Sequence, residues 1–257
     1  MKKIIIPVDF SDHSEYALKT AAKLAKKHDA ELLVLHMLEM SDIMLTTSEG
    51  FQSQKAAFFL QIAEQKLEGF LKKDYLNDLK VTSIIKHFKV FSEVNDVALK
   101  NDADLIVMGS HGSSGIAEFF VGSNTERVVR NANIPVLVVK NNVSDVNFNV
   151  VAFACSFSEE TIKPYLNAVK MFDKIDTKFY LVHVNLPNDR FMSSLEIEQK
   201  AVNFFTKAER NLTKMKDVHY VCDYTVEEGV LNCANKIGAD LIIVPTHGRK
   251  GLAHFFE

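Results

Sequence analysis

Cysteine, surplus positive charge and long apolar runs are all scarce in this chain, and each scarcity excludes a class of protein. Three of the 257 residues are cysteine, and because they form no C-x-x-C pair, neither a disulfide framework nor a zinc site is indicated. A net charge of −3 leaves no surplus of lysine and arginine to neutralise nucleic-acid phosphates. No apolar run approaches the roughly 18 residues of a membrane span. We therefore expect a cytoplasmic protein with neither nucleic acid nor membrane as a partner.

The beginning of the chain predicts a buried strand rather than a targeting segment. The apolar run within Met1–Asp9 is about five residues long, which is too short for the core of a signal peptide. The apolar fraction of 47% and the charged fraction of 25% are ordinary for a globular protein. At this length the chain has room for one large domain or for two domains of ordinary size.

A glycine-containing segment is the most informative part of the sequence. Gly109 and Gly112 follow the apolar run 104–107, and nine residues after Gly112 come Gly122 and Ser123, which open a helical pattern. A strand that passes through glycines into a helix presents backbone N–H groups to phosphate, because glycine permits close approach and a helix N-terminus has unpaired donors. The spacing predicts a phosphate or nucleotide site, although one such glycine pair alone would indicate only an ordinary loop.

The same segment lacks the residues of a phosphoryl-transfer site. No lysine or arginine lies between Gly109 and Glu126, so this is not a Walker-type loop. A triphosphate bound here would depend on backbone dipoles and on Mg²⁺, whereas efficient transferases recruit lysine, arginine or metal to the transition state. His111 can contact phosphate, but no carboxylate partner is visible nearby to orient it as a base. We therefore expect a binder, with no catalytic residue and no metal held by the protein itself.

Residues 123–126 also have the pattern of a capping box. In this interpretation the Ser123 hydroxyl accepts a hydrogen bond from the backbone N–H of Glu126 and begins the helix. The interpretation is compatible with ligand binding, because a hydroxyl that accepts from the backbone can still donate to a phosphate.

The chain consists of two copies of one unit. Residues 103–120 and 239–256 agree at ten of eighteen positions, and the opening 4–11 aligns with 151–158. The period of about 140 residues is far too long for a solenoid. The polar segment 140–147 is the expected linker.

Within the first copy, short apolar strands alternate with amphipathic helices. The expected strands are residues 4–8, 31–37, 80–88, 104–108 and 136–139, and the expected helices are 12–28, 51–74, 93–101 and 123–131. This alternation predicts a parallel sheet covered on both faces. In such folds ligands bind outside the carboxyl ends of the strands, where the strand order reverses. Asp9 and Gly109 both follow strands, so we expect them at one crevice.

Asp9 and Pro7 each allow two interpretations. Asp9 can be a carboxylate that stabilises a helix start, or it can accept a ribose hydroxyl at the switch point. Pro7 lacks a ladder donor inside an expected central strand, which indicates either a backbone bent toward a ligand or a simple irregularity. His36 and His183 end matching strands, and we expect them to be hydrogen-bonded structural residues.

The motif Gly-x₂-Gly-x₉-Gly-Ser, formed by Gly109, Gly112, Gly122 and Ser123, resembles that of the universal stress protein family. The opening 7–11 and the closing segment 135–140 are also similar to the family, and the resemblance extends over the whole chain as two tandem copies. It implies a Rossmann-like, doubly wound α/β fold with a five-stranded parallel sheet in each copy. Members with the intact motif bind ATP, whereas others lack the motif and do not.

The resemblance also implies roles for individual residues of the first copy. Asp9 would reach the ribose, and Pro7, Val8 and Met37 would line the adenine pocket. Met108 and Gly109 would flank the base and the sugar. The expected cofactor-binding residues are Pro7, Val8, Asp9, Met37, Met108, Gly109, His111, Gly112, Gly122, Ser123, Asn124 and Thr125, with ATP and its accompanying Mg²⁺ as the ligand.

The second copy departs from the motif. Ser156 replaces Asp9, Ala154 replaces Pro7 and Pro245 replaces Gly109, where proline removes a donor and stiffens the loop. We expect residues 1–141 to form the ATP-binding domain and 148–257 a degenerate, structural domain that is truncated before its last helix and strand. Arg249 and Lys250 keep anion binding open there. The resemblance implies that the two copies pair as an intramolecular pseudo-dimer, with a homodimer as a further option.

Three functions remain as hypotheses. The first is a stress-response protein that binds ATP as a regulatory or sensing ligand. The second is a slow ATP hydrolase, and the third is a stress scaffold that binds no nucleotide and acts through partners. The intact loop without catalytic cations favours the first.

Overall fold

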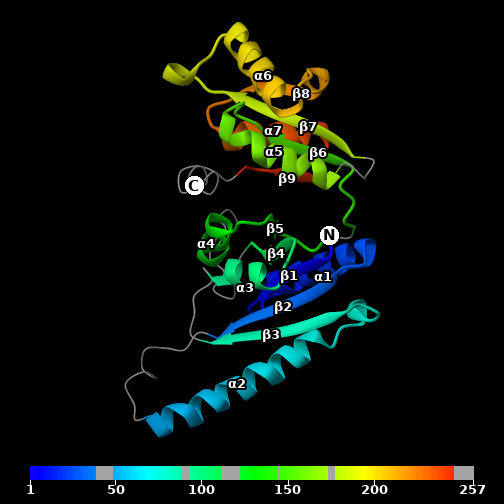
Figure 1. Cartoon of the computed structure of the whole chain (residues 1–257), viewed down its shortest axis with the longest axis vertical. Helices are drawn as coiled ribbons and strands as arrows, with labels where there is room; N and C mark the ends of the chain where they lie inside the picture. The colour runs from blue at the N-terminus through cyan, green and yellow to red at the C-terminus, as the bar shows by residue number, and fades with distance from the viewer. Residues whose placement is uncertain (39–48, 88–92, 111–121, 144, 173–176, 246–257) are drawn as a thin grey trace. The chain divides into compact units, whose positions relative to one another are not determined.

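The computed structural model describes residues 1–38, 49–87, 93–110, 122–143, 145–172 and 177–245 (Figure 1). The chain divides into two compact units, Met1–Val146 and Asn147–Glu257. The division falls inside the polar segment 140–147 that the sequence marks as a linker.

Unit 1 contains a five-stranded sheet in which every neighbouring pair is parallel, with the order β3-β2-β1-β4-β5. The strands are β1 (Lys3–Val8), β2 (Glu31–Leu38), β3 (Val81–His87), β4 (Leu105–Gly109) and β5 (Val136–Val139), and the helices are α1 (Asp12–His28), α2 (Glu49–Leu71), α3 (Val94–Lys100) and α4 (Ser123–Asn131), with a 3₁₀ turn, η2 (Asp74–Leu76), before β3. The predicted parallel α/β fold is confirmed.

Helices cover both faces of this sheet, which explains why its central strands are apolar throughout. Successive side chains of β1 point to opposite faces, and Ile4, Ile5 and Ile6 are all fully buried. The face that contains Ile5 packs against α3 and α4, through Val97 and Val128. The other face packs against α1, whose alanines and leucines are buried. The sheet is therefore doubly wound, as the alternation predicts.

The strand order places a topological switch point between β1 and β4. β1 is in register with β2 as far as Val8, but with β4 only at Ile4 and Ile5. The Lys3 carbonyl accepts from Asp104, so by alternation the backbone groups of Pro7 also face the β4 side. The missing N–H of Pro7 therefore falls beyond the registered pairing with β4. The proline lies at the edge where ligands bind in folds of this kind.

Unit 2 repeats the arrangement with four described parallel strands in the order β8-β7-β6-β9. Its elements are β6 (Val150–Ala154), α5 (Glu159–Phe172), β7 (Lys178–Asn185), η4 (Asn188–Arg190), α6 (Ser194–Glu209), η5 (Thr213–Asp217), β8 (Val218–Cys222), α7 (Val226–Ile237) and β9 (Leu241–Ile243). One face of the sheet packs an aromatic core that includes Phe153, Tyr165 and Phe204, and the other packs α7.

The same hydrogen bonds recur inside each of the two units, as the strands do. Asp104 accepts at Oδ2 from the backbone N–H groups of Lys2, at 2.5 Å, and Lys3, at 3.1 Å. Asp240 accepts at Oδ2 from Asn149 and Val150 at 3.0 and 2.9 Å. Each aspartate thus joins the start of its unit's central strand to the strand at the switch point. The internal repeat is therefore structural as well as sequential.

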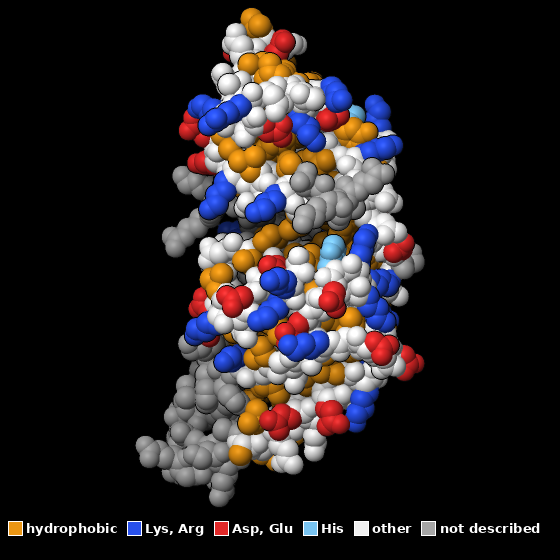
Figure 2. All heavy atoms as spheres, turned by 45° about the vertical axis from the view of Figure 1, so that its right-hand side comes forward, with side chains coloured by type: hydrophobic (Ala, Val, Ile, Leu, Met, Phe, Trp, Pro, Cys, Tyr) orange, Lys and Arg blue, Asp and Glu red, His pale blue; other side chains and the backbone are white. Residues whose placement is uncertain are grey.

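Among the described residues, no helix is long and apolar enough to cross a bilayer. On the face drawn in Figure 2, positively and negatively charged side chains are interspersed rather than gathered by sign. Such mixing matches the balanced composition of the chain.

Candidate functional site

The parallel strands bring most of the predicted site residues to one edge of the unit 1 sheet. Pro7 and Val8 end β1, Met37 lies near the end of β2, and Met108 and Gly109 end β4. Val8, Met37 and Met108 are at most 5% exposed. Met37 and Met108 belong to the core cluster that contains Ile5, whereas Val8, three residues after Ile5, points to the opposite face of the sheet. His111 and Gly112 lie outside the described residues, and their predicted roles stay predictions.

Backbone hydrogen bonds fix the start of α4 against the end of β4. The Ser110 N–H donates to Val139 O at 3.0 Å, which continues the pairing with β5. The Gly122 N–H then donates to Ser110 O at 2.7 Å. The N-terminus of α4 is therefore held at the carboxyl edge of the sheet, beside the switch point.

The capping box predicted at Ser123 is wrong. Gly122 is the N-cap, and the first helical bond runs from Glu126 N–H to Gly122 O at 3.0 Å. The Glu126 carboxylate pairs with Arg130 instead of returning to the cap. Ser123 is therefore the first helical residue, and its exposed hydroxyl makes no hydrogen bond within the described part of the chain. The N–H groups of residues 123–125 precede the first helical bond, so they have no acceptor in the helix.

Thr125 has a clear structural contact. Its side chain is 3% exposed, and its hydroxyl donates to Gly109 O at 2.8 Å. Because a hydroxyl has one proton, that proton is committed to the end of β4. The predicted phosphate contact of Thr125 stays a prediction, and its backbone N–H is the group that can make it.

Gly109 is required by packing against α1. A Cβ at this position would lie 2.7 Å from His13 O and 2.8 Å from the His13 Cβ. Real Cβ atoms essentially never approach backbone so closely, so a side chain here would displace α1. The sequence explained this glycine by close approach of phosphate, whereas the structure adds a tertiary cause that operates without a ligand.

We predict that Gly109→Ala lowers the free energy of unfolding by about 1–3 kcal/mol in the absence of nucleotide, because the methyl group overpacks the α1 contact. Chemical denaturation of the ligand-free chain measures the effect. Gly69→Ala is the matched control, since that helical position has nothing within 4 Å of the added Cβ. The control should stabilise slightly, because alanine is the better helix former. If Gly109→Ala leaves the free energy of unfolding unchanged, packing does not require the glycine, and ligand binding alone would explain it.

The turn after β1 orients Asp9. Phe10 has a φ of 67°, which is uncommon for an aromatic residue, and its ring centroid lies 4.4 Å from that of His36. The His36 ring in turn places Nδ1 2.9 Å from Val8 O. Asp9 then accepts two hydrogen bonds from Ser11 at the N-cap of α1. The interpretation of Asp9 as a helix-start carboxylate is confirmed, and its contact with a ribose stays a prediction.

Unit 2 builds the same turn with a matching Phe–His pair. Phe157 has a φ of 56° and stacks on His183 at 4.9 Å, and His183 Nδ1 lies 2.9 Å from Cys155 O. Since a carbonyl only accepts, Nδ1 carries the proton in both units. Burial lowers the pKa of His183, which disfavours the charged form of its ring. The structural role predicted for the two histidines is confirmed, so the Phe–His pair belongs to the fold rather than to a ligand site.

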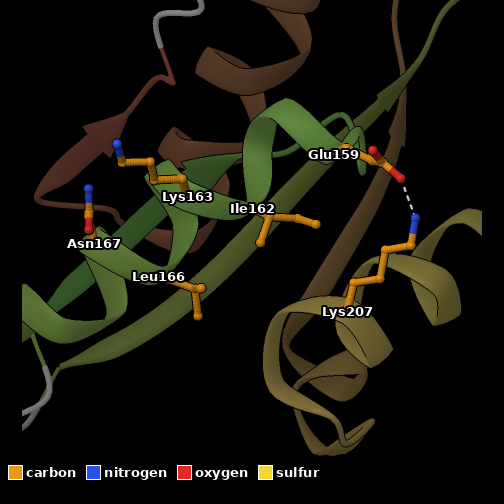
Figure 3. Close-up of a pocket in the computed structure, with 6 residues that line it drawn as sticks. All are labelled: Glu159, Ile162, Lys163, Leu166, Asn167 and Lys207. Carbon is orange, nitrogen blue, oxygen red and sulfur yellow. Dashed lines mark hydrogen bonds and ion pairs between the residues drawn. The ribbon is translucent and has the colours of Figure 1, made fainter.

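A separate depression lies on unit 2, between α5 and α6. It has a volume of about 450 Å³ and is lined by Glu159, Ile162, Lys163, Leu166, Asn167 and Lys207 (Figure 3). Lys207 forms an ion pair with Glu159 across it. The depression contains none of the residues predicted for nucleotide binding, and the described residues contain no group of three or more His, Cys, Asp or Glu side chains that could hold a metal.

Known proteins are similar to this chain in sequence and in fold. A model of the universal stress protein family matches residues 1–140. Two universal stress proteins of Methanocaldococcus jannaschii are similar: MJ0531 is 34% identical over 139 residues, covering 54% of this chain and 82% of that protein. MJ0577 is 31% identical over 153 residues, covering 54% of this chain and 94% of that protein. The chain therefore belongs to the universal stress protein family.

A solved structure resembles both units at the level of the fold. The putative universal stress protein from Pseudomonas aeruginosa UCBPP-PA14 covers 100% of this chain and 86% of its own, with a TM-score of 0.61 and 13% identity. The family model, by contrast, reaches only the first copy. Unit 2 is thus recognised from the internal repeat and from its sheet, which agrees with the prediction of a tandem arrangement.

Proposed function

We propose that unit 1 binds ATP together with Mg²⁺, and that the bound nucleotide regulates a cytoplasmic stress response rather than being consumed. The observation that carries this proposal is the geometry at the switch point, where the N-terminus of α4 is held beside the ends of β1 and β4. The donors of residues 123–125 and the dipole of α4 suit the phosphates. Asp9, at the end of the neighbouring strand, suits the ribose.

The residues present fit such a ligand. The side chains of Val8, Met37 and Met108 make the surroundings of a base at this edge of the sheet apolar, and the Ser123 hydroxyl can donate to a phosphate. Mg²⁺ usually binds through substrate phosphates and waters with one or two carboxylates, so it would arrive with the nucleotide. The absence of lysine and arginine from the segment 110–125 supports binding over transfer.

We predict that millimolar Mg-ATP raises the melting temperature of the full chain, and that calorimetric titration finds one site per chain. A ligand at about 100 times its Kd stabilises the folded state by about 2.7 kcal/mol. Gly122→Val tests the site, because its side chain would stand where α4 begins and where the phosphates approach. Mass spectrometry of nucleotide released from the freshly purified chain identifies the ligand.

The outcomes separate the three hypotheses. Retention of intact ATP with no turnover agrees with a regulatory ligand. Repeated release of ADP or AMP, abolished in Ser123→Ala, would replace the proposal with slow hydrolysis. A melting temperature that Mg-ATP leaves unchanged in both the wild type and Gly122→Val would favour the scaffold without nucleotide.

A further inference from the structure

The two units differ in the hydrogen bonds at the start of their first helices, and in unit 1 these bonds centre on Ser11. In unit 1, Ser11 donates to Asp9 Oδ1 twice, from its hydroxyl at 2.6 Å and from its backbone N–H at 3.1 Å. The same hydroxyl accepts from the Ser14 N–H at 3.2 Å. Ser11 thus links the first turn of α1 to the Asp9 carboxylate through a chain of hydrogen bonds.

Unit 2 has a serine at the position of Ser11 but, among its described residues, lacks the hydrogen bonds to a carboxylate. Ser156, Ser158 and Thr161 occupy the positions of Asp9, Ser11 and Ser14, and their hydroxyls lie 2.9–3.0 Å apart in a closed triangle. The triangle contains no charge and is satisfied within itself. The turn, the Phe–His pair and the helix start are common to both units, so the fold does not require a carboxylate here. The carboxylate and its fixed orientation are what unit 1 adds.

We propose that Ser11 is a positioning residue for nucleotide binding, which holds the Asp9 carboxylate in the orientation that receives a ribose hydroxyl. Both bonds from Ser11 go to Oδ1, and a carboxylate has about four acceptor sites, so these two bonds do not by themselves prevent the group from accepting from a ligand. Hydrogen bonds to a charged group are short and strong, which suits them to fixing one rotamer. The inference rests on the proposed function, and it assigns to Ser11 the specificity for the sugar.

The experiment compares ATP with 2′,3′-dideoxy-ATP in calorimetric titrations of the full chain and its variants. The wild type should prefer ATP. Ser11→Ala should weaken ATP binding about tenfold, as expected for a lost hydrogen bond to a charged group, and leave the dideoxy nucleotide unaffected. Equal weakening of both nucleotides, or of neither, overturns the inference.

Capping and positioning are separated by a matched pair of variants. Asparagine and aspartate both cap helices well, but only asparagine can donate to Asp9. Ser11→Asn should therefore keep the preference for ATP, whereas Ser11→Asp should lose it. Ser193→Ala removes a similar cap from α6, where Ser193 Oγ accepts from Glu196 N–H at 3.3 Å, and should leave binding unchanged. If Ser11→Asn and Ser11→Asp behave alike, Ser11 acts only as a cap and the inference is overturned.

The inference and the proposed function can fail separately. A wild-type chain that binds neither nucleotide overturns both. A wild-type chain that binds ATP and the dideoxy nucleotide equally well leaves nucleotide binding in place and overturns the role of Ser11.

Discussion

Asp9→Ser is expected to weaken ATP binding by unit 1 about 100-fold, since a carboxylate that accepts from a ribose hydroxyl contributes about 1.5–3 kcal/mol through that charged hydrogen bond. The substitution installs the residue that unit 2 carries at the same position, Ser156. It also removes the partner of Ser11, so the sugar loses the carboxylate that Ser11 holds in place. Calorimetric titration with Mg-ATP measures the change in Kd.

The control for Asp9→Ser is Asp12→Asn. Asp12 lies in the first turn of α1 and is exposed, so the variant removes one charge from the same helix start without touching the sheet edge. Both variants weaken the favourable interaction of a carboxylate with the helix dipole, which amounts to about 0.3–1 kcal/mol. Binding should fall only in Asp9→Ser. Equal Kd values for Asp9→Ser and the wild type would show that Asp9 serves the helix start alone.

The helices and strands of unit 1 could be predicted because each has a clear local pattern of apolar and polar residues. Apolar strands such as 4–8 and 104–108 alternate with amphipathic helices, and that alternation predicts a parallel sheet covered on both faces. The strand order, and with it the position of the switch point, comes from the structure. The expected edges of these elements agree closely with the observed ones. The second unit was predictable from the repeat, since Ala103-Asp104-Leu105-Ile106 recurs at 239–242.

What the sequence did not predict correctly are contacts between residues far apart in the chain, and positions where two neighbouring residues could play the same role. Gly122 and Ser123 are both good N-caps, so the pattern alone could not decide between them. The structure selects Gly122 because its N–H is bonded to Ser110 O, twelve residues earlier. Gly109 is crowded by His13, 96 positions away, and no local pattern signals that contact. The sequence did point to Ser11, which stands two residues after the aspartate that follows β1. Its contact with that aspartate, however, became visible only from the hydrogen bonds of the structure.

Phe153→Ala is expected to destabilise unit 2 by about 3–5 kcal/mol while leaving ATP binding by unit 1 intact. Phe153 is fully buried on β6, and its ring lies 5.7 Å from that of Tyr165 and 5.9 Å from that of Phe179. Truncation leaves a cavity inside an aromatic cluster whose members support one another. Chemical denaturation followed by circular dichroism measures the loss, and titration with Mg-ATP measures binding in native buffer.

The matched variant in the other unit is Ile5→Ala, which opens a cavity at a fully buried position of β1. Its cost is about 2–5 kcal/mol, and it falls on the sheet that carries the candidate site. Saturating Mg-ATP should recover part of this loss, because a ligand stabilises the unit that binds it. The same nucleotide should recover nothing in Phe153→Ala, since every residue of the candidate site lies in unit 1. Recovery in Phe153→Ala but not in Ile5→Ala would move the nucleotide site to unit 2.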